Sequence, residues 1–320
     1  MSGSNFPNGF ANGVTIRGVP VDVPNPGQVF WVNNSTVLAK GGIGGSNGND
    51  GSYRQPFSTL DYAIGKCTAS RGDVIYIMPG HAETVSSASF ITCDVIGVTI
   101  IGLGSGSLRP TFTWSATAST IVVSAADVSF VNCRFVANIL NVVTGFSVSG
   151  NGFEMHNCEC RDSSAILTFI LFVTLDDGAD RAKFTGNNFT GIGVTNDSFI
   201  SMAGTHDDIV VKDNYMAYSA IQTATVALIT SATACTNFIC AGNSFATISA
   251  AGKWIGLTGT GNTGVVKYND FLSDADQTAA EHKAGGDVTG CMFYENYFSS
   301  GVDFLALSSS TIGYTDEDVT

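Results

Sequence analysis

The sequence predicts an all-β protein, a right-handed parallel β-helix built from coils of about 25–29 residues. Its composition is the first observation, because charged residues make up only 13% of the chain. That is too few to solvate the outer faces of many helices. The 37 glycines, with abundant Ser, Thr and Asn, instead suit short strands separated by turns.

A recurring motif is the second observation. Segments such as FVNCRF (130–135) and CAGNSF (240–245) align on one position, with successive gaps of 25, 29, 27, 29, 26 and 27 residues. The aligned residues are Cys133, Cys158, Asn187, Asn214, Asn243, Asn269 and Asn296. Stacked coils place equivalent positions about 4.8 Å apart. We therefore expect the asparagines to form a ladder at a bend, where Asn tolerates left-handed backbone geometry.

The core and the exclusion of rival repeats complete the argument for the fold. Two residues after each aligned position comes an apolar residue, which predicts an internal stack of side chains: Phe135, Cys160, Phe189, Met216, Phe245, Phe271 and Phe298. The leucine-rich repeat has a similar period but needs a recurring LxxLxL pattern, which is missing here. The β-helix is the repeat that fits.

Three regions are expected along the chain. Residues 1–45, rich in Asn, Gly and Pro, form an N-terminal arm that we expect to lie outside the coils and to attach to a partner. Residues 46–72 hold a linker and a short capping helix, which begins at a capping box of Ser58 and Asp61. Residues 73–320 form the β-helix itself.

Two segments carry a resemblance to known proteins. The stretch GGSNGNDGSYRQPFSTLDYAIGKCTASRGDVIYIMPGHAETV (44–85) resembles the opening of the pectin-lyase-like right-handed β-helix superfamily, with its PFxTLxxAI and GDxIYxxPG elements. That resemblance implies the fold but not the function, since the superfamily includes lyases, hydrolases, phage tailspikes and non-enzymatic virion proteins. The preceding FPNGFANGVTIRGVP and VPNPGQVFWVNNS are similar to the start of structural proteins of tailed bacteriophages.

Charge and cysteine usage limit the partners. A net charge of −13 with only 14 Lys and Arg residues argues against a nucleic-acid partner. The sequence has no apolar run of about 18 residues, so no membrane span is expected. The eight cysteines lack the spacing of a zinc site, and we expect them to be reduced core thiols. No cofactor or metal is expected.

An acidic cluster is the strongest candidate for chemistry. Asp180 and Asp207 lie 27 residues apart and should stack on adjacent coils, while Arg181 and Asp208 occupy the next position and could pair. Stacked carboxylates could serve a retaining glycosidase or hold Ca²⁺. The same positions elsewhere carry Asn or Asp, as turn residues do. We therefore expect solvated turns and no enzyme activity, and the histidines are isolated in the repeat: His81, His156 and His282.

These observations favour a structural virion protein of a tailed phage. We expect a capsid decoration or cement protein, a homotrimer that binds the major capsid protein on the head surface after assembly in the host cytoplasm. The large apolar residues of the arm are the expected attachment points: Phe6, Phe10, Ile16, Phe30 and Trp31. Two alternatives stay open, a tailspike or fibre module that binds or degrades bacterial polysaccharide, and a free polysaccharide lyase or hydrolase.

Overall fold

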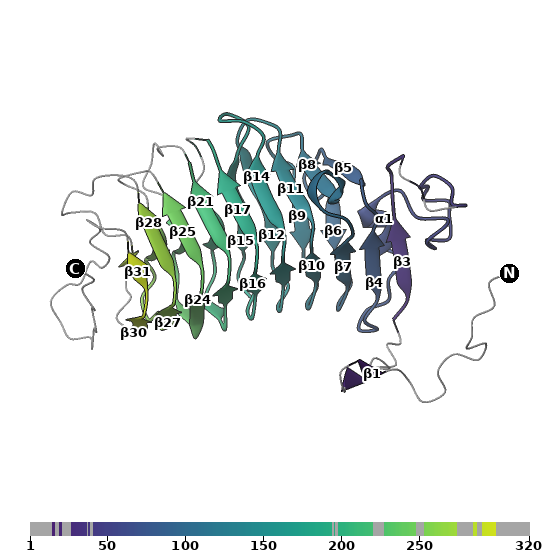
Figure 1. Ribbon diagram of the computed structural model, residues 1–320. Helices are drawn as coiled ribbons and strands as arrows, with labels where there is room; N and C mark the ends of the chain where they lie inside the picture. The colour runs from purple at the N-terminus through teal and green to yellow at the C-terminus, as the bar shows by residue number, and fades with distance from the viewer. Residues whose placement is uncertain are drawn as a thin grey trace.

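The chain winds into a parallel β-solenoid in which three long sheets run side by side (Figure 1). The computed structural model describes residues 15–16, 19–20, 27–36, 38, 41–193, 195, 198–219, 227–247, 253–273, 284–286 and 290–298. Each complete coil contributes one strand to each sheet, and every pairing within the three sheets is parallel. The expectation of an all-β parallel β-helix is confirmed at this level.

In the part of the chain that the structure describes, the three sheets have ten, nine and eight strands. The first sheet contains β3 (Val29–Val32), β4 (Val74–Ile77), β7 (Thr99–Gly102), β10 (Ser129–Val131), β13 (Glu154–His156), β16 (Lys183–Thr185), β20 (Val210–Lys212), β24 (Phe238–Ala241), β27 (Thr263–Lys267) and β30 (Gly290–Tyr294). The second contains β5 (Ala82–Val85), β8 (Thr111–Trp114), β11 (Arg134–Ala137), β14 (Glu159–Asp162), β17 (Asn188–Gly191), β21 (Tyr215–Tyr218), β25 (Ser244–Thr247), β28 (Asp270–Ser273) and β31 (Tyr297–Phe298). The third contains β6 (Ile91–Cys93), β9 (Ile121–Val123), β12 (Val142–Val148), β15 (Phe169–Leu175), β18 (Ser198–Met202), β22 (Ala227–Ser231), β26 (Lys253–Leu257) and β29 (Ala284–Gly286).

A few short elements complete the described chain. β1 (Thr15–Ile16) pairs with β2 (Val19–Pro20) in an antiparallel hairpin, and β19 (His206–Asp207) pairs with β23 (Cys235–Thr236) between two coils. The described residues contain one helix, α1 (Leu60–Ile64), and one 3-10 turn, η1 (Gly106–Leu108). No helix in the described part of the chain has the length and apolar character of a membrane span.

The core follows from the alternation of side chains along each strand. In the second sheet the register aligns one inward position from coil to coil, and its described occupants from β8 to β28 are all buried: Phe112, Phe135, Cys160, Phe189, Met216, Phe245 and Phe271. The cysteines are free thiols, seven of them buried and Cys67 partly so.

The N-terminal end differs from expectation in two ways. β3 pairs in parallel with β4 (Figure 1), so part of the expected arm of residues 1–45 belongs to the solenoid. The helix begins after Thr59, and no side chain of the expected capping box bonds to its first turn. Instead, the Leu60 N–H donates to Glu83 Oε2 at 3.0 Å, a carboxylate from the next coil.

The turn between the first and second sheets, here the ladder corner, holds the asparagines. The Nδ2 of each donates to the Oδ1 of the next at 2.9–3.0 Å, from Asn187 through Asn214, Asn243 and Asn269 to Asn296. The left-handed backbone, however, lies one residue earlier, as at Asn132 and Asp213, and not at the ladder positions. This corrects the expectation, since the ladder side chains must turn inward while the preceding residue makes the bend.

Candidate functional site

The acidic cluster lies at the turn between the third and first sheets, here the acidic corner. Asp180 precedes β16, and Asp207 lies in β19 of the next coil. Asp180 Oδ1 accepts the Asp207 N–H at 2.9 Å, and Asp207 Oδ1 accepts from Thr236 Oγ1 at 2.6 Å and from Asn237 Nδ2 at 2.9 Å. The carboxylates therefore join three successive coils by hydrogen bonds.

Backbone geometry explains the residue types at this corner. Residues in left-handed conformation stack there from coil to coil, with φ between 56° and 73°: Asp127, Gly152, Arg181, Asp208 and Asn237. Asp, Asn and Gly tolerate this region better than other residues do. Four of the five positions carry the residues that such a turn selects, and Arg181 is the exception.

Arg181 pairs with residues of earlier coils and not with Asp208, the partner that the spacing allowed. Its Nε donates to Asn151 Oδ1 at 2.8 Å, and its Nη2 lies 3.8 Å from Asp127 Oδ1. The side chain thus reaches back over two earlier coils. Both ends of the Arg181–Asp127 pair are more than half exposed, so the pair adds little to stability.

His206 lies beneath the acidic corner and is buried. Its Nε2 accepts the Gly204 N–H at 3.2 Å, which requires an unprotonated nitrogen, and its Nδ1 has no hydrogen-bond partner among the described residues. Burial lowers the pKa of His206, while the carboxylates of Asp180 and Asp177 act in the opposite direction. Within the described residues, no three His, Cys, Asp or Glu side chains are grouped as a metal site would require.

The other histidines are each paired with a glutamate two residues away or lie outside the described residues. His156 Nε2 is 2.9 Å from Glu154 Oε2 on the outer face of β13. His81 Nε2 is 3.1 Å from Glu83 Oε2, and both of these side chains are buried. His282 falls outside the described residues.

The buried His81–Glu83 pair was missed by sequence reasoning. Glu83 is in register with Phe112, so it occupies the first position of the inward Phe column. Its Oε2 accepts from Leu60 N–H and contacts His81, whose Nδ1 accepts the Asn34 N–H at 3.2 Å. The signal in the sequence was Glu83, a charged residue at a repeat position that is otherwise apolar. Glu83 lies at the N-terminal end of the core.

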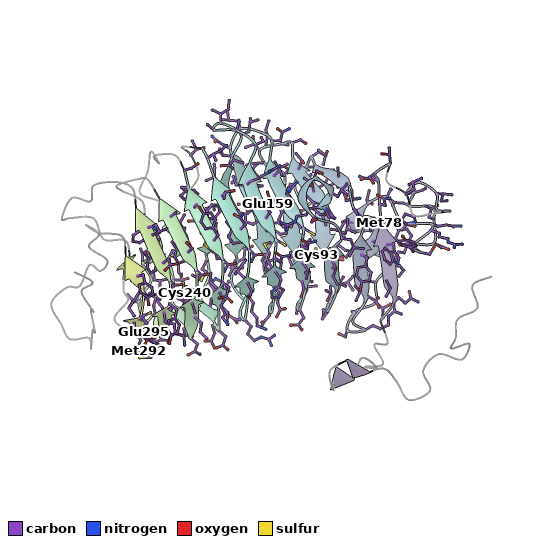
Figure 2. All side chains as sticks on the ribbon, viewed as in Figure 1. Met78, Cys93, Glu159, Cys240, Met292 and Glu295 are labelled. Carbon is purple, nitrogen blue, oxygen red and sulfur yellow. The ribbon has the colours of Figure 1, made fainter. Side chains whose placement is uncertain are left out.

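A group of arginines on and beside the second sheet was also missed. Arg134 Nε donates to Glu159 Oε2 at 2.9 Å, while Arg109 Nη1 and Arg161 Nη1 lie 3.5 Å from the same carboxylate. Figure 2 labels Glu159 midway along the solenoid. Three cations around one anion leave an excess of two positive charges in a chain of net charge −13. The 25-residue spacing of Arg134 and Glu159, which equals one coil, was the signal.

The expected attachment residues divide into two groups. Phe30 is buried against Phe57, and Trp31 packs between Tyr53 and Tyr76 with ring centroids 4.9 Å from each. These two aromatic residues belong to the first coil, where Phe30 is buried and Trp31 stays partly exposed. Ile16 lies in β1, while Phe6 and Phe10 fall outside the described residues.

Comparisons with known proteins give one distant likeness. No protein-family model matches the chain, and no curated protein matches it. A solved structure described as a rhamnogalacturonan lyase aligns with 84% of this chain and 87% of its own, at 12% sequence identity and a TM-score of 0.45. The β-solenoid assignment therefore rests on the strand pairing of this chain.

Proposed function

We propose that the chain is a structural virion protein of a tailed phage, a decoration or cement protein on the capsid surface. The observation that carries this proposal is the use of the acidic cluster as a structural element. Asp180 and Asp207 accept hydrogen bonds that fasten one coil to the next, and Asp208 makes a turn. Carboxylates engaged in this way hold a scaffold together, which favours a role for the solenoid as a rigid projecting body.

Attachment is assigned to the residues before β3. Because Phe30 and Trp31 pack within the first coil, the expected attachment residues that remain are Phe6, Phe10 and Ile16. Burying each against the major capsid protein would contribute about 1.5–3 kcal/mol. The protein would assemble in the host cytoplasm as a homotrimer and remain on the virion.

Two finer features of the fold belong to the same proposal. The coil is right-handed, the sense that nearly all parallel crossover connections adopt. The helix α1 closes the N-terminal end of the core, since Leu60, Ala63 and Ile64 are buried beside the first strands. A closed end prevents the first coil from pairing with other chains.

Particle binding tests the proposal. Phe6→Ser combined with Phe10→Ser in the full chain should abolish binding to capsids stripped of the protein, because the apolar anchor is lost. Val29→Ser is the matched control, since Val29 is an exposed apolar residue of the first coil. Unchanged affinity of the double variant, or copurification of the wild type with tails only, would contradict head attachment.

A second candidate is favoured by the arginines around Glu159. A tailspike or fibre module would use such a cationic face to bind an acidic bacterial polysaccharide. Loss of polysaccharide retention by Arg161→Glu, with Arg54→Glu as the exposed control, would support this alternative. Glycan breakdown that disappears in Asp207→Asn/Asp208→Asn would instead support a lyase or hydrolase.

A further inference from the structure

The last two coils break the rule that governs the ladder corner. The residue before each ladder position is left-handed in seven successive coils, and the first five carry Asn, Gly or Asp: Asn132, Asn157, Gly186, Asp213 and Gly242. The last two carry Tyr268 and Glu295, at φ 56° and 53°. A bulky aromatic residue in this region is strained. Strain that a simple substitution would relieve points to a use for the side chain.

Tyr268 lies in an exposed apolar patch that wraps around the ladder corner. On the first sheet the patch includes Ile239, 40% exposed, and Met292, 58% exposed. Tyr268 at the corner is 53% exposed, and on the second sheet Leu272 and Tyr297 are 46% and 65% exposed. We call these five residues the corner patch. Figure 2 labels Met292 and Glu295 at the C-terminal end of the solenoid.

Charges of both signs border the corner patch. Lys267 Nζ lies 5.4 Å from the centroid of the Tyr268 ring and 5.7 Å from that of Tyr294, on the first-sheet side. Glu295 lies at the corner, where a hydrogen bond from Tyr268 raises the pKa of that tyrosine. Asp270 is exposed on the second-sheet side. The two faces of the patch therefore carry opposite charge and complement each other.

The same corner is polar earlier in the solenoid. There, Arg134 is paired with Glu159 and Lys183 with Glu154 across neighbouring strands, and Glu154 also contacts His156 of its own strand. Among the described residues, the large apolar side chains exposed at this corner are concentrated in the last coils, and Tyr215 of β21, 43% exposed, precedes them. Exposed Tyr and Met with few charged groups is the composition of a protein interface, whereas isolated surface apolar residues need no explanation.

We propose that the corner patch joins copies of this chain into a closed ring, with the ladder corner of each copy nearest the symmetry axis. A patch that wraps a corner offers its first-sheet face to one neighbour and its second-sheet face to the other, which is the contact that closes a ring. Lys267 of one copy then meets Asp270 or Glu295 of the next. The proposal identifies the interface of the homotrimer and so rests on the self-association in the proposed function.

Assembly of the full chain, followed by analytical ultracentrifugation and native mass spectrometry, tests the interface. The wild type should form a trimer at micromolar concentration. Met292→Glu with Tyr297→Ser should raise the dissociation constant by about 30-fold or more, as removal of central interface residues does. Ile166→Glu is the control, because Ile166 is 66% exposed but lies far from the patch, and it should leave assembly unchanged. A monomeric wild type, or a trimer that the double variant leaves intact, overturns the proposal.

The Tyr268→Asn variant distinguishes a role of Tyr268 in assembly from a role in the stability of the fold. It places at the corner the residue type found at Asn132 and Asn157, so the dissociated chain should unfold at an equal or higher temperature. Assembly should weaken by about tenfold or more, because an aromatic contact is removed. Unchanged assembly would overturn the role assigned to Tyr268. Capsid binding is measured separately, with the Phe6→Ser/Phe10→Ser variant. A failure of the ring proposal therefore leaves the attachment proposal intact, and a failure of attachment leaves the ring proposal intact.

Discussion

The ladder corner is built in two ways along one solenoid. In the coils that contain β10 and β13 its inward position is a thiol, Cys133 or Cys158, whereas from β16 onward it is an amide. The Cys133 N–H donates to Cys158 Sγ at 3.5 Å, and the equivalent Asn214 N–H donates to Asn243 Oδ1 at 3.0 Å. The backbone is the same, but the amide supplies a strong acceptor and the thiol a weak one.

Aromatic packing is denser in the coils with a thiol at the ladder corner (the thiol coils) than in the coils with an amide there (the amide coils). In the thiol coils Phe135 contacts five other rings, with centroids 4.9–6.1 Å away: Phe112, Trp114, Phe130, Phe146 and Phe172. In the amide coils Phe245 stacks on Phe271 at 5.0 Å. The comparison teaches that a coil can be held in register by apolar packing where its corner bonds are weak, and by an amide ladder where its core is less aromatic.

The largest expected effect comes from removing an aromatic ring in each region. Phe135→Ala should lower the free energy of unfolding by about 5 kcal/mol and Phe245→Ala by about 3 kcal/mol, because the cavity left by Phe135 removes more ring contacts. Urea denaturation measures both. Equal losses, or a larger loss at Phe245, would mean that the aromatic network does not compensate for the weaker corner.

The next largest effect is expected in the amide ladder. Asn243→Ala should cost about 3 kcal/mol, because Asn243 accepts from Asn214 and donates to Val211 O and Asn269 Oδ1, and buried partners are left unsatisfied. Asn296→Ala is the control and should cost about 1 kcal/mol, since Asn296 ends the described ladder and is only partly buried. Small and equal losses of unfolding free energy in the two variants would show that the ladder does not contribute to stability.

The fold was predictable because it repeats. The 25–29-residue spacing and the apolar position of each coil gave the parallel solenoid and its inward column, while Asn in successive coils gave the ladder. Single departures from the repeat were harder to interpret. Pro24 and Pro26 suggested an arm without strands, yet β3 begins at Val29, three residues after the last of these prolines.

Side-chain partners at the acidic corner were not predictable from spacing. Arg181 and Asp208 occupy equivalent positions, but both have left-handed backbone, and the long Arg181 side chain reaches Asn151 and Asp127 instead. The His81–Glu83 pair was hidden for a related reason, because its partners Asn34 and Leu60 lie far away in the sequence. Contacts at the ends of a repeat do not follow the repeat.

Lowering the pH should destabilise the coils after β18, because His206 becomes protonated when the chain unfolds. Burial lowers its pKa below the usual value of 6.5, so the unfolded chain binds more protons than the folded chain just below that pH. Stability should therefore fall as the pH drops below about 6.5, by about 1.4 kcal/mol for each unit of pKa difference. His206→Gln should remove this part of the pH dependence, measured as the free energy of unfolding at pH 7.5 and 5. An unchanged slope would assign it to other groups.

The smallest effect is expected where one corner type is converted into the other. Cys158 Sγ takes the place of an amide, since it accepts the Cys133 N–H and lies 3.6 Å from Phe130 O. In Cys158→Asn the Oδ1 would accept that N–H, and the Nδ2 would donate to Phe130 O and Asn187 Oδ1, as Asn187 does in the next coil. The change in unfolding free energy should stay within about 1 kcal/mol, because new hydrogen bonds offset the loss of an apolar group. Cys158→Ala, which leaves the Cys133 N–H without an acceptor, should be the less stable of the two. Greater stability of the alanine variant in urea denaturation would show that the aromatic coils have no room for an amide, and that the ladder stops at Asn187 for reasons of packing.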